Sequence, residues 1–231
     1  MSLNPNNDIS TALNKIDDLV NEALISSGRS VGSVTKIAIS KNHSVTRVQM
    51  ALDAGHRVFG ENRLQEALDK WPPLKEKFND IELHFVGSLQ GNKVARAVKT
   101  FKYIHTIDRV DIARKVAKEM DKSACRPHCF IQVNTGEESQ KSGVLPKEAD
   151  SLITECRDNL DLPLIGLMCV PPQEEESALH FAFLREIAKR NGLKNLSMGM
   201  SADFETAISF GATHIRIGTV VFGNRPIEEA L

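Results

Sequence analysis

The sequence predicts an α/β protein, specifically a single (β/α)8 TIM barrel with an extra N-terminal helix. Two observations carry this prediction. Eight short apolar segments alternate with amphipathic segments along the chain, and the length of 231 residues is close to that of one small barrel. A doubly wound open sheet is the rival architecture, and a count of eight strands favours closure into a barrel. We therefore expect one domain over residues 1–231, in which residues 1–30 form a helical extension.

The helical extension comes first along the chain. Ile9, Leu13 and Ile16 repeat at helical spacing, and Gly28 is a suitable stop. Beyond it, each strand is expected where a short apolar run is bounded by polar residues or glycine. The predicted strands cover residues 36–40, 58–60, 83–87, 103–106, 130–133, 164–170, 196–198 and 214–218.

Seven helices are expected between these strands, each marked by apolar residues at helical spacing. Gly55 and Gly211 would end the first and the last of them, and Pro72-Pro73 would end the second. A short final helix is expected after Pro226. The apolar faces of the seven helices include Val48, Leu68, Val98, Val116, Leu152, Phe181 and Ala207.

The composition argues against several classes of protein. With 41% hydrophobic and 26% charged residues, the chain is typical of a soluble globular protein with a substantial core. A formal net charge of -1 gives no general attraction to nucleic acid or to an anionic membrane. No apolar run approaches the roughly 20 residues that span a bilayer, and residues 1–7 lack the basic and apolar regions of a signal peptide. We therefore expect a cytoplasmic protein that binds neither nucleic acid nor membrane.

The four cysteines do not predict a metal centre. Cys156 and Cys169 lie in apolar patterns that are typical of small core residues. Cys125, His128 and Cys129 are close enough in sequence to hold a metal in principle. However, no second pair stands at zinc-site spacing, and Cys129 leads directly into a predicted strand. We expect no metal site.

Lys41 is the first candidate functional residue, because it stands at the polar end of the first predicted strand. The active face of a TIM barrel is built from the loops that follow the strands, so this lysine belongs at the mouth. An amine held against apolar walls loses hydration, which disfavours its ammonium form. A neutral amine can attack an aldehyde, which makes Lys41 a candidate Schiff-base lysine. The alternative is an ordinary strand-end lysine that extends into water.

Small and hydroxyl residues follow the last two predicted strands: Ser201 after the seventh, and Gly218 with Thr219 after the eighth. Barrels frequently bind phosphate at this pair of loops, because backbone N–H groups can approach an anion and helix N-termini add a favourable dipole. Helix capping by Ser201 and tight turns at the glycines are the structural alternatives. Asp203 and Glu205 would repel a dianion slightly, which favours contacts from backbone and hydroxyl groups.

Two further residues complete the candidate site. Arg216 shares a strand face with Gly218, and an arginine that points into a barrel needs an acceptor or an anion because it stays charged. An outward position, or pairing with a buried carboxylate, is the alternative. Asn62 follows the second strand, where it could supply an amide to a ligand or merely start a helix. His84 and His105 lie within strands and are expected to be core histidines.

These residues resemble one family along nearly the whole chain, the pyridoxal phosphate homeostasis proteins, also called the YggS/PROSC family. That family is similar to the N-terminal barrel domain of alanine racemase, so the resemblance implies the same barrel. The stretch that includes residues 216–219 and 222–223 is the most specific. The matching stretches are residues 38–41, 59–62, 65–66, 84–87, 89–90, 92–93, 133–134, 141–143, 166–168, 196–201, 216–219 and 222–223.

The resemblance implies that the cofactor is pyridoxal 5'-phosphate (PLP) and that Lys41 holds it as a Schiff base. Those residues that follow the last two strands would hold the phosphate, and Arg216 would lie near the cofactor. The implied role is PLP (vitamin B6) homeostasis in the cell, without established catalytic turnover, and PLP-dependent apoenzymes are the partners it suggests. The implied cofactor contacts besides Lys41 are Asn62, Ser201, Arg216, Gly218 and Thr219.

Two positions depart from the family pattern. Ser88 stands where the family usually has proline, and Gly91 replaces a common serine. We expect the third loop to be more flexible as a result, with no effect on the cofactor lysine or the phosphate loops.

Two alternative functions remain open. A PLP-dependent amino-acid racemase needs a second base opposite the lysine, and the racemases that this barrel resembles take a tyrosine for that role from an added β-domain of a partner chain. The 231 residues contain no such domain, and their one tyrosine, Tyr103, is expected at the fourth strand rather than at the mouth. This weakens the racemase hypothesis and is compatible with a monomer. A Schiff-base aldolase that acts on a sugar phosphate is the second alternative.

Overall fold

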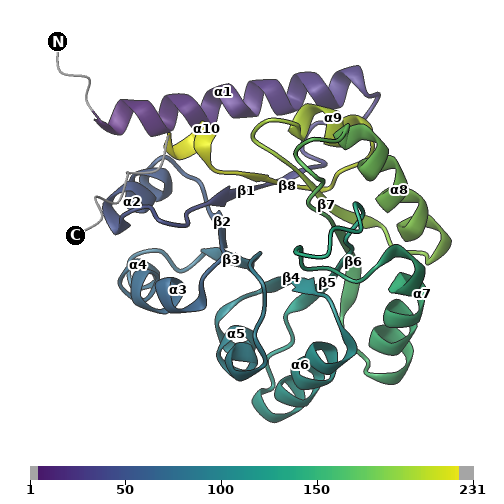
Figure 1. Ribbon diagram of the computed structural model, residues 1–231. Coiled ribbons are helices and arrows are strands. Elements are labelled where there is room, and N and C mark those ends of the chain that lie inside the picture. Colours follow the sequence, from purple (N-terminus) through teal and green to yellow (C-terminus); the bar gives the residue numbers. More distant parts are fainter. Residues whose placement is uncertain (1–4, 224–231) are drawn as a thin grey trace.

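The computed structural model describes residues 5–223, with the side chains of residues 5–8 left out of the description. Eight parallel strands form a closed barrel in chain order, and β8 pairs with β1 to close it (Figure 1). The predicted (β/α)8 TIM barrel is thus confirmed, and the open sheet is wrong. Each predicted strand overlaps an observed one. The strands are β1 (Thr35–Ile39), β2 (Val58–Glu61), β3 (Glu82–Phe85), β4 (Tyr103–Ile107), β5 (His128–Gln132), β6 (Leu164–Met168), β7 (Asn195–Met200) and β8 (His214–Ile217).

The helices surround the barrel (Figure 1). All seven predicted helices are present, whereas the four-residue helices α4 and α10 were not foreseen. Pro72-Pro73 ends α3 as expected but also begins α4, because proline is tolerated in the first turn of a helix. The expected helix after Pro226 lies outside the described residues. The helices are α2 (Val45–Asp53), α3 (Leu64–Lys70), α4 (Pro72–Lys75), α5 (Val94–Thr100), α6 (Val110–Ser123), α7 (Pro146–Thr154), α8 (Ser177–Arg190), α9 (Phe204–Ser209) and α10 (Thr219–Phe222).

The N-terminal extension forms α1 (Pro5–Ser26), which lies across the barrel against α9 and α10 (Figure 1). It buries one apolar face, and burial of a large aliphatic side chain contributes about 1.5–3 kcal/mol. Just beyond the helix, Arg29 Nη1 donates to the carbonyl oxygens of Ile208 and Ala212, at 2.8 Å each. The extension therefore packs against the outer helices and joins the hydrophobic core of the described residues. Its buried side chains include Ile9, Leu13, Ile16, Val20 and Leu24.

The interior of the barrel is unusually rich in polar side chains. His84, His105 and His214 are buried inside it together with Phe130, and the rings of His105 and Phe130 stack at 4.3 Å between centroids. The outer layer, between strands and helices, is mostly apolar and includes the buried Cys156 and Cys169 that the sequence places in the core. Within residues 5–223, no helix has the length and apolar character needed to cross a membrane.

Candidate functional site

A cavity of about 370 Å³ opens at the carboxyl ends of the strands. This volume lies within the usual range for small-molecule sites, roughly 300–1,000 Å³. Volume alone does not single it out, because a cavity beside α1 measures about 440 Å³; the chemistry of its walls does. Six of its lining residues are the six that the sequence predicts: Lys41, Asn62, Ser201, Arg216, Gly218 and Thr219. The others are Ile39, His43, Val86, Val170, Met200 and Ala202.

Lys41 lies two residues beyond the end of β1 and is half-buried at the rim of the cavity. The chain then turns sharply, because Asn42 adopts a left-handed conformation with φ of 62°, which asparagine tolerates better than most residues. The backbone N–H of Asn42 donates to Glu66 Oε1 at 2.7 Å. This bond holds the backbone on the C-terminal side of Lys41.

A buried charged cluster holds the backbone on the other side of Lys41. Glu61 Oε1 accepts hydrogen bonds from Ser40 Oγ at 2.7 Å, Lys70 Nζ at 3.0 Å and Trp71 Nε1 at 3.1 Å. Lys70 Nζ also donates to the Ser40 carbonyl oxygen and to Glu66 Oε1, at 2.7 Å each. Burial raises the pKa of the Glu61 carboxyl, and the Lys70 ammonium opposes that rise. The cluster therefore ties the ends of β1 and β2 to α3 beneath Lys41.

Ser201 joins the two loops that the sequence predicts as a phosphate site. Its Oγ accepts a hydrogen bond from the backbone N–H of Gly218 at 3.3 Å. It does not cap α9, because Asp203 occupies the N-cap position. The carboxylate of Asp203 instead accepts from the backbone N–H of Met200 at 2.6 Å. The capping explanation for Ser201 is therefore wrong, and the hydroxyl lies at the cavity wall.

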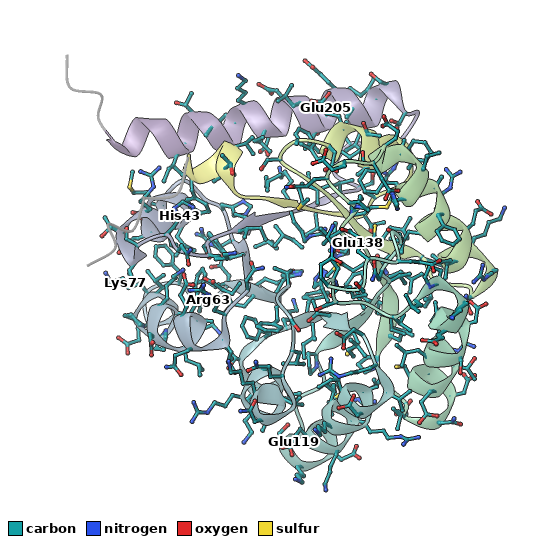
Figure 2. The ribbon with its side chains drawn as sticks, in the orientation of Figure 1. His43, Arg63, Lys77, Glu119, Glu138 and Glu205 are labelled. Atoms are coloured by element: carbon teal, nitrogen blue, oxygen red, sulfur yellow. The ribbon has the colours of Figure 1, made fainter. Side chains whose placement is uncertain are left out.

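Neither of the two acidic residues near these loops lines the cavity. Asp203 turns back toward β7, and Glu205 lies beside α1, where it lines a separate cavity (Figure 2). Thr219 begins α10, and the first N–H groups of a helix have no carbonyl acceptor within it. The cavity wall at the ends of β7 and β8 therefore presents hydroxyl and N–H groups, as an anionic ligand requires.

Arg216 points into the barrel, as strand alternation predicts, and it is buried at the base of the cavity. Its Nη1 donates to Ser197 Oγ at 2.9 Å and its Nη2 to the Cys169 carbonyl oxygen at 2.8 Å. Both hydrogen-bond acceptors are neutral, so the alternative of pairing with a buried carboxylate is wrong for the residues that the structure describes. Burial lowers the pKa of Arg216, but a guanidinium remains charged at neutral pH. The arginine thus supplies a positive charge to the cavity wall.

Tyr103 lies away from the cavity, as the sequence predicts. It begins β4, and its ring stacks on that of His84 with 4.2 Å between centroids. His43, which sequence reasoning did not single out, lies near α2 and α10 (Figure 2). Its ring packs against Phe222 with 4.8 Å between centroids. Of the two departures in the third loop, Ser88 places its Oγ at 3.5 Å from Ser142 Oγ, and Gly91 begins a short 3₁₀ turn.

A buried histidine, His214, is expected to make the free energy of unfolding depend on pH between about 6.5 and 4. Burial lowers the pKa of His214 from 6.5 to about 4, so the unfolded chain binds a proton that the folded state rejects. The free energy of unfolding should therefore fall as pH drops from about 6.5 toward 4, by about 2 kcal/mol between pH 7 and pH 5 for this group alone. The charges of His84 and Arg216 also lower the pKa of His214, and the charge of Glu82 raises it. Urea unfolding of the wild type at both pH values measures the change.

The variant His214→Phe isolates this contribution. The raised pKa of Glu61 acts in the opposite sense, so the comparison between variant and wild type is more informative than the total. We expect the variant to lose less stability than the wild type on acidification. Equal losses in both proteins would contradict the assignment.

A closed eight-stranded barrel with a cavity at the carboxyl ends of its strands is typical of TIM barrels that bind small molecules. Comparison with known proteins identifies the family. Residues 14–226 match the family model described as alanine racemase, N-terminal domain. The pyridoxal phosphate homeostasis protein of Escherichia coli (strain K12) is 37% identical over 228 residues, which cover 95% of this chain and 97% of that protein. The protein of the same name from Pseudomonas aeruginosa is 38% identical over 216 residues, covering 91% and 93%. The chain belongs to the pyridoxal phosphate homeostasis protein family.

Solved structures agree with this assignment. PipY of Synechococcus elongatus PCC7942 without PLP is 33% identical, with a TM-score of 0.80, and the match covers 88% of this chain and 100% of PipY. PipY with PLP bound gives 32% identity and a TM-score of 0.76, with the same coverage. An alanine racemase of Clostridium difficile 630 is 13% identical, with a TM-score of 0.72, over 96% of this chain and 57% of the racemase. That last likeness shows the fold alone.

Proposed function

We propose that this protein binds PLP as a Schiff base on Lys41 and serves in PLP homeostasis in the cell. The observation that carries the proposal is that Lys41 and the Ser201–Gly218 pair line one cavity. An amine and a phosphate-binding wall are the two features that a phosphorylated aldehyde requires. PipY, a relative at 32% identity, has been solved with PLP bound. We propose that residues 1–231 form one PLP-binding domain.

Each residue of the site has a proposed role. Lys41 Nζ adds to the aldehyde carbon, and one water leaves as the C=N bond forms. The Ser201 hydroxyl and the Thr219 N–H would hold the phosphate, because donors suit a dianion. Gly218 would contribute through its N–H, which donates to Ser201 Oγ and leaves the hydroxyl proton of Ser201 to face the phosphate. Arg216 lies near the cofactor, and the Asn62 amide is a further contact. PLP, when bound, supplies an electron sink to any reaction at this site.

A carrier role fits the site better than a racemase. The only tyrosine of the chain, Tyr103, starts β4 and does not line the cavity. A two-base racemase would exchange the Cα hydrogen of alanine or serine for deuterium in heavy water. We expect no exchange above that of free PLP.

We further propose that the protein is a cytoplasmic monomer that supplies PLP-dependent apoenzymes.

Titration with PLP tests the proposal directly. We expect a visible Schiff-base absorbance band with the wild type and none with Lys41→Ala, because Lys41 is the only lysine among the described residues that line the cavity. Lys77→Ala is the matched control, since Lys77 is exposed on the outer side of the molecule (Figure 2). A wild type without the band would overturn the proposal and leave a sugar-phosphate aldolase as the alternative.

The phosphate contact makes a separate prediction. Ser201→Ala removes one donor to the phosphate, and a hydrogen bond to a charged group is worth about 1.5–3 kcal/mol, so PLP should bind at least about tenfold more weakly. Pyridoxal, which lacks the phosphate, should bind both proteins equally. Ser209→Ala is the control, because its exposed hydroxyl donates only to Thr206 O within α9. An equal loss for PLP and pyridoxal would show that Ser201 does not contact the phosphate.

A further inference from the structure

A series of polar side chains crosses the interior of the barrel from the cavity toward its opposite end. Arg216 Nη1 lies 2.9 Å from Ser197 Oγ, and that oxygen lies 2.9 Å from His105 Nδ1. His105 Nε2 lies 2.9 Å from His84 Nδ1, and His84 Nε2 lies 3.0 Å from Glu82 Oε1. His84, His105 and Ser197 are fully buried. Side chains of β8, β7, β4 and β3 thus form one continuous hydrogen-bonded series.

The charges at the two ends fix the direction of every bond in the series. Hydrogen bonds from His84 and Lys102 lower the pKa of Glu82 to about 2, so its ionised carboxylate accepts the His84 Nε2–H. Burial lowers the pKa of His84, so the ring is neutral and its Nδ1 can only accept. His105 Nε2–H must therefore donate to it.

The same reasoning determines the remaining two bonds. Burial lowers the pKa of His105 well below its usual range, so this ring is also neutral. Since its Nε2 carries the proton, its Nδ1 accepts from the Ser197 hydroxyl. Ser197 Oγ in turn accepts from Arg216, which has only donors. Every donor therefore points the same way, from the guanidinium to the carboxylate, and hydrogen bonds aligned in this manner polarise one another.

We propose that Ser197, His105 and His84 are positioning residues. They connect the Arg216 guanidinium to the Glu82 carboxylate through hydrogen bonds, and in this way they hold the guanidinium at the cavity wall. The ligand side of this inference rests on the proposed function, because PLP is the molecule that the guanidinium would face. The series holds Nη1 of Arg216 through Ser197 Oγ, and the Cys169 carbonyl oxygen holds Nη2. Loss of Ser197 leaves the arginine with only the Cys169 carbonyl oxygen, whereas loss of His105 or His84 removes the support behind Ser197.

The protein without PLP provides the first test. Nitrogen-15 NMR of the imidazole rings distinguishes the two neutral tautomers and the imidazolium. We expect both His84 and His105 to carry their proton on Nε2 at neutral pH, with each assigned from the variants His84→Gln and His105→Gln. A proton on Nδ1 of either ring, or a charged ring, would overturn the proposal whether or not PLP binds.

PLP titration provides the second test. Ser197→Ala should bind PLP about tenfold more weakly, as expected for the loss of a hydrogen bond to a charged group, with a shifted absorbance maximum of the bound cofactor. Ser197→Thr retains the hydroxyl and should restore both properties. Ser209→Ala, on the exposed side of α9, should match the wild type. Thermal unfolding confirms that each variant is folded.

The outcomes separate the two proposals. If the wild type binds PLP and Ser197→Ala matches its affinity and spectrum, Ser197 only packs in the core and the positioning role is refuted. If the wild type binds no PLP, the proposed function fails, and the tautomers alone decide whether the directed series exists.

Discussion

Lys70→Met should lower the free energy of unfolding by about 3–5 kcal/mol, the usual cost of removing one partner from a buried ion pair. Lys70 is 5% exposed and donates to both Glu61 and Glu66. Without it, the fully buried Glu61 carboxylate loses the cation that offsets its burial. The Ser40 carbonyl oxygen loses a donor as well. Urea unfolding measures the change, and PLP titration should show weaker binding because the backbone beside Lys41 is released.

Two comparisons make this result specific to the buried charge. Lys77→Met removes an exposed lysine and should change stability by less than about 0.5 kcal/mol. Adding Glu61→Gln to Lys70→Met neutralises the stranded carboxylate and should recover part of the loss. A Lys70→Met protein as stable as the wild type would show that the cluster does not hold the ends of β1 and β2 together.

The second large effect is expected at Gly199, just before the end of β7. Gly199 has φ of 90°, and a Cβ there would lie 2.5 Å from the Ala207 Cβ and 3.0 Å from the Phe204 Cα. The left-handed backbone costs other residues about 1–2 kcal/mol, and overpacking adds about 1–3 kcal/mol. Gly199→Ala should therefore lose roughly 2–5 kcal/mol of stability. The shift should also displace Ser201 and weaken PLP binding.

Gly192→Ala separates the two causes. Gly192 also has a positive φ, of 69°, but nothing lies within 4 Å of a Cβ built there. This variant should show only the backbone cost and normal PLP binding. If both alanine variants lose the same stability, the contact with α9 has no part in shaping the loop that follows β7.

The barrel could be predicted because its elements are local patterns. Short apolar strands such as β1 and β8 end at polar or glycine residues, and two-residue alternation places Arg216 on the inner face. The same local patterns do not predict α4. Pro72-Pro73 is typical of the end of a helix, but proline also suits the start of a helix, and α4 begins there.

The supporting contacts of the site could not be predicted, because they join residues far apart in sequence. Ser197 meets His105 across 92 positions, and Lys70 meets the Ser40 carbonyl across 30. The spacing of Glu66 and Lys70, which suits a helical ion pair, was the one available signal for the charged cluster. No local pattern identified Glu61, whose partners come together only when β1, β2 and α3 pack.

The most direct test of the central claim is to trap the bound cofactor and locate it. The wild type is mixed with an equimolar amount of PLP and reduced with borohydride, which converts a Schiff base to a stable amine, and its peptides are mapped by mass spectrometry. We expect one phosphopyridoxyl group per chain, on Lys41. Label spread over exposed lysines such as Lys77, with Lys41 unmodified, would contradict the account.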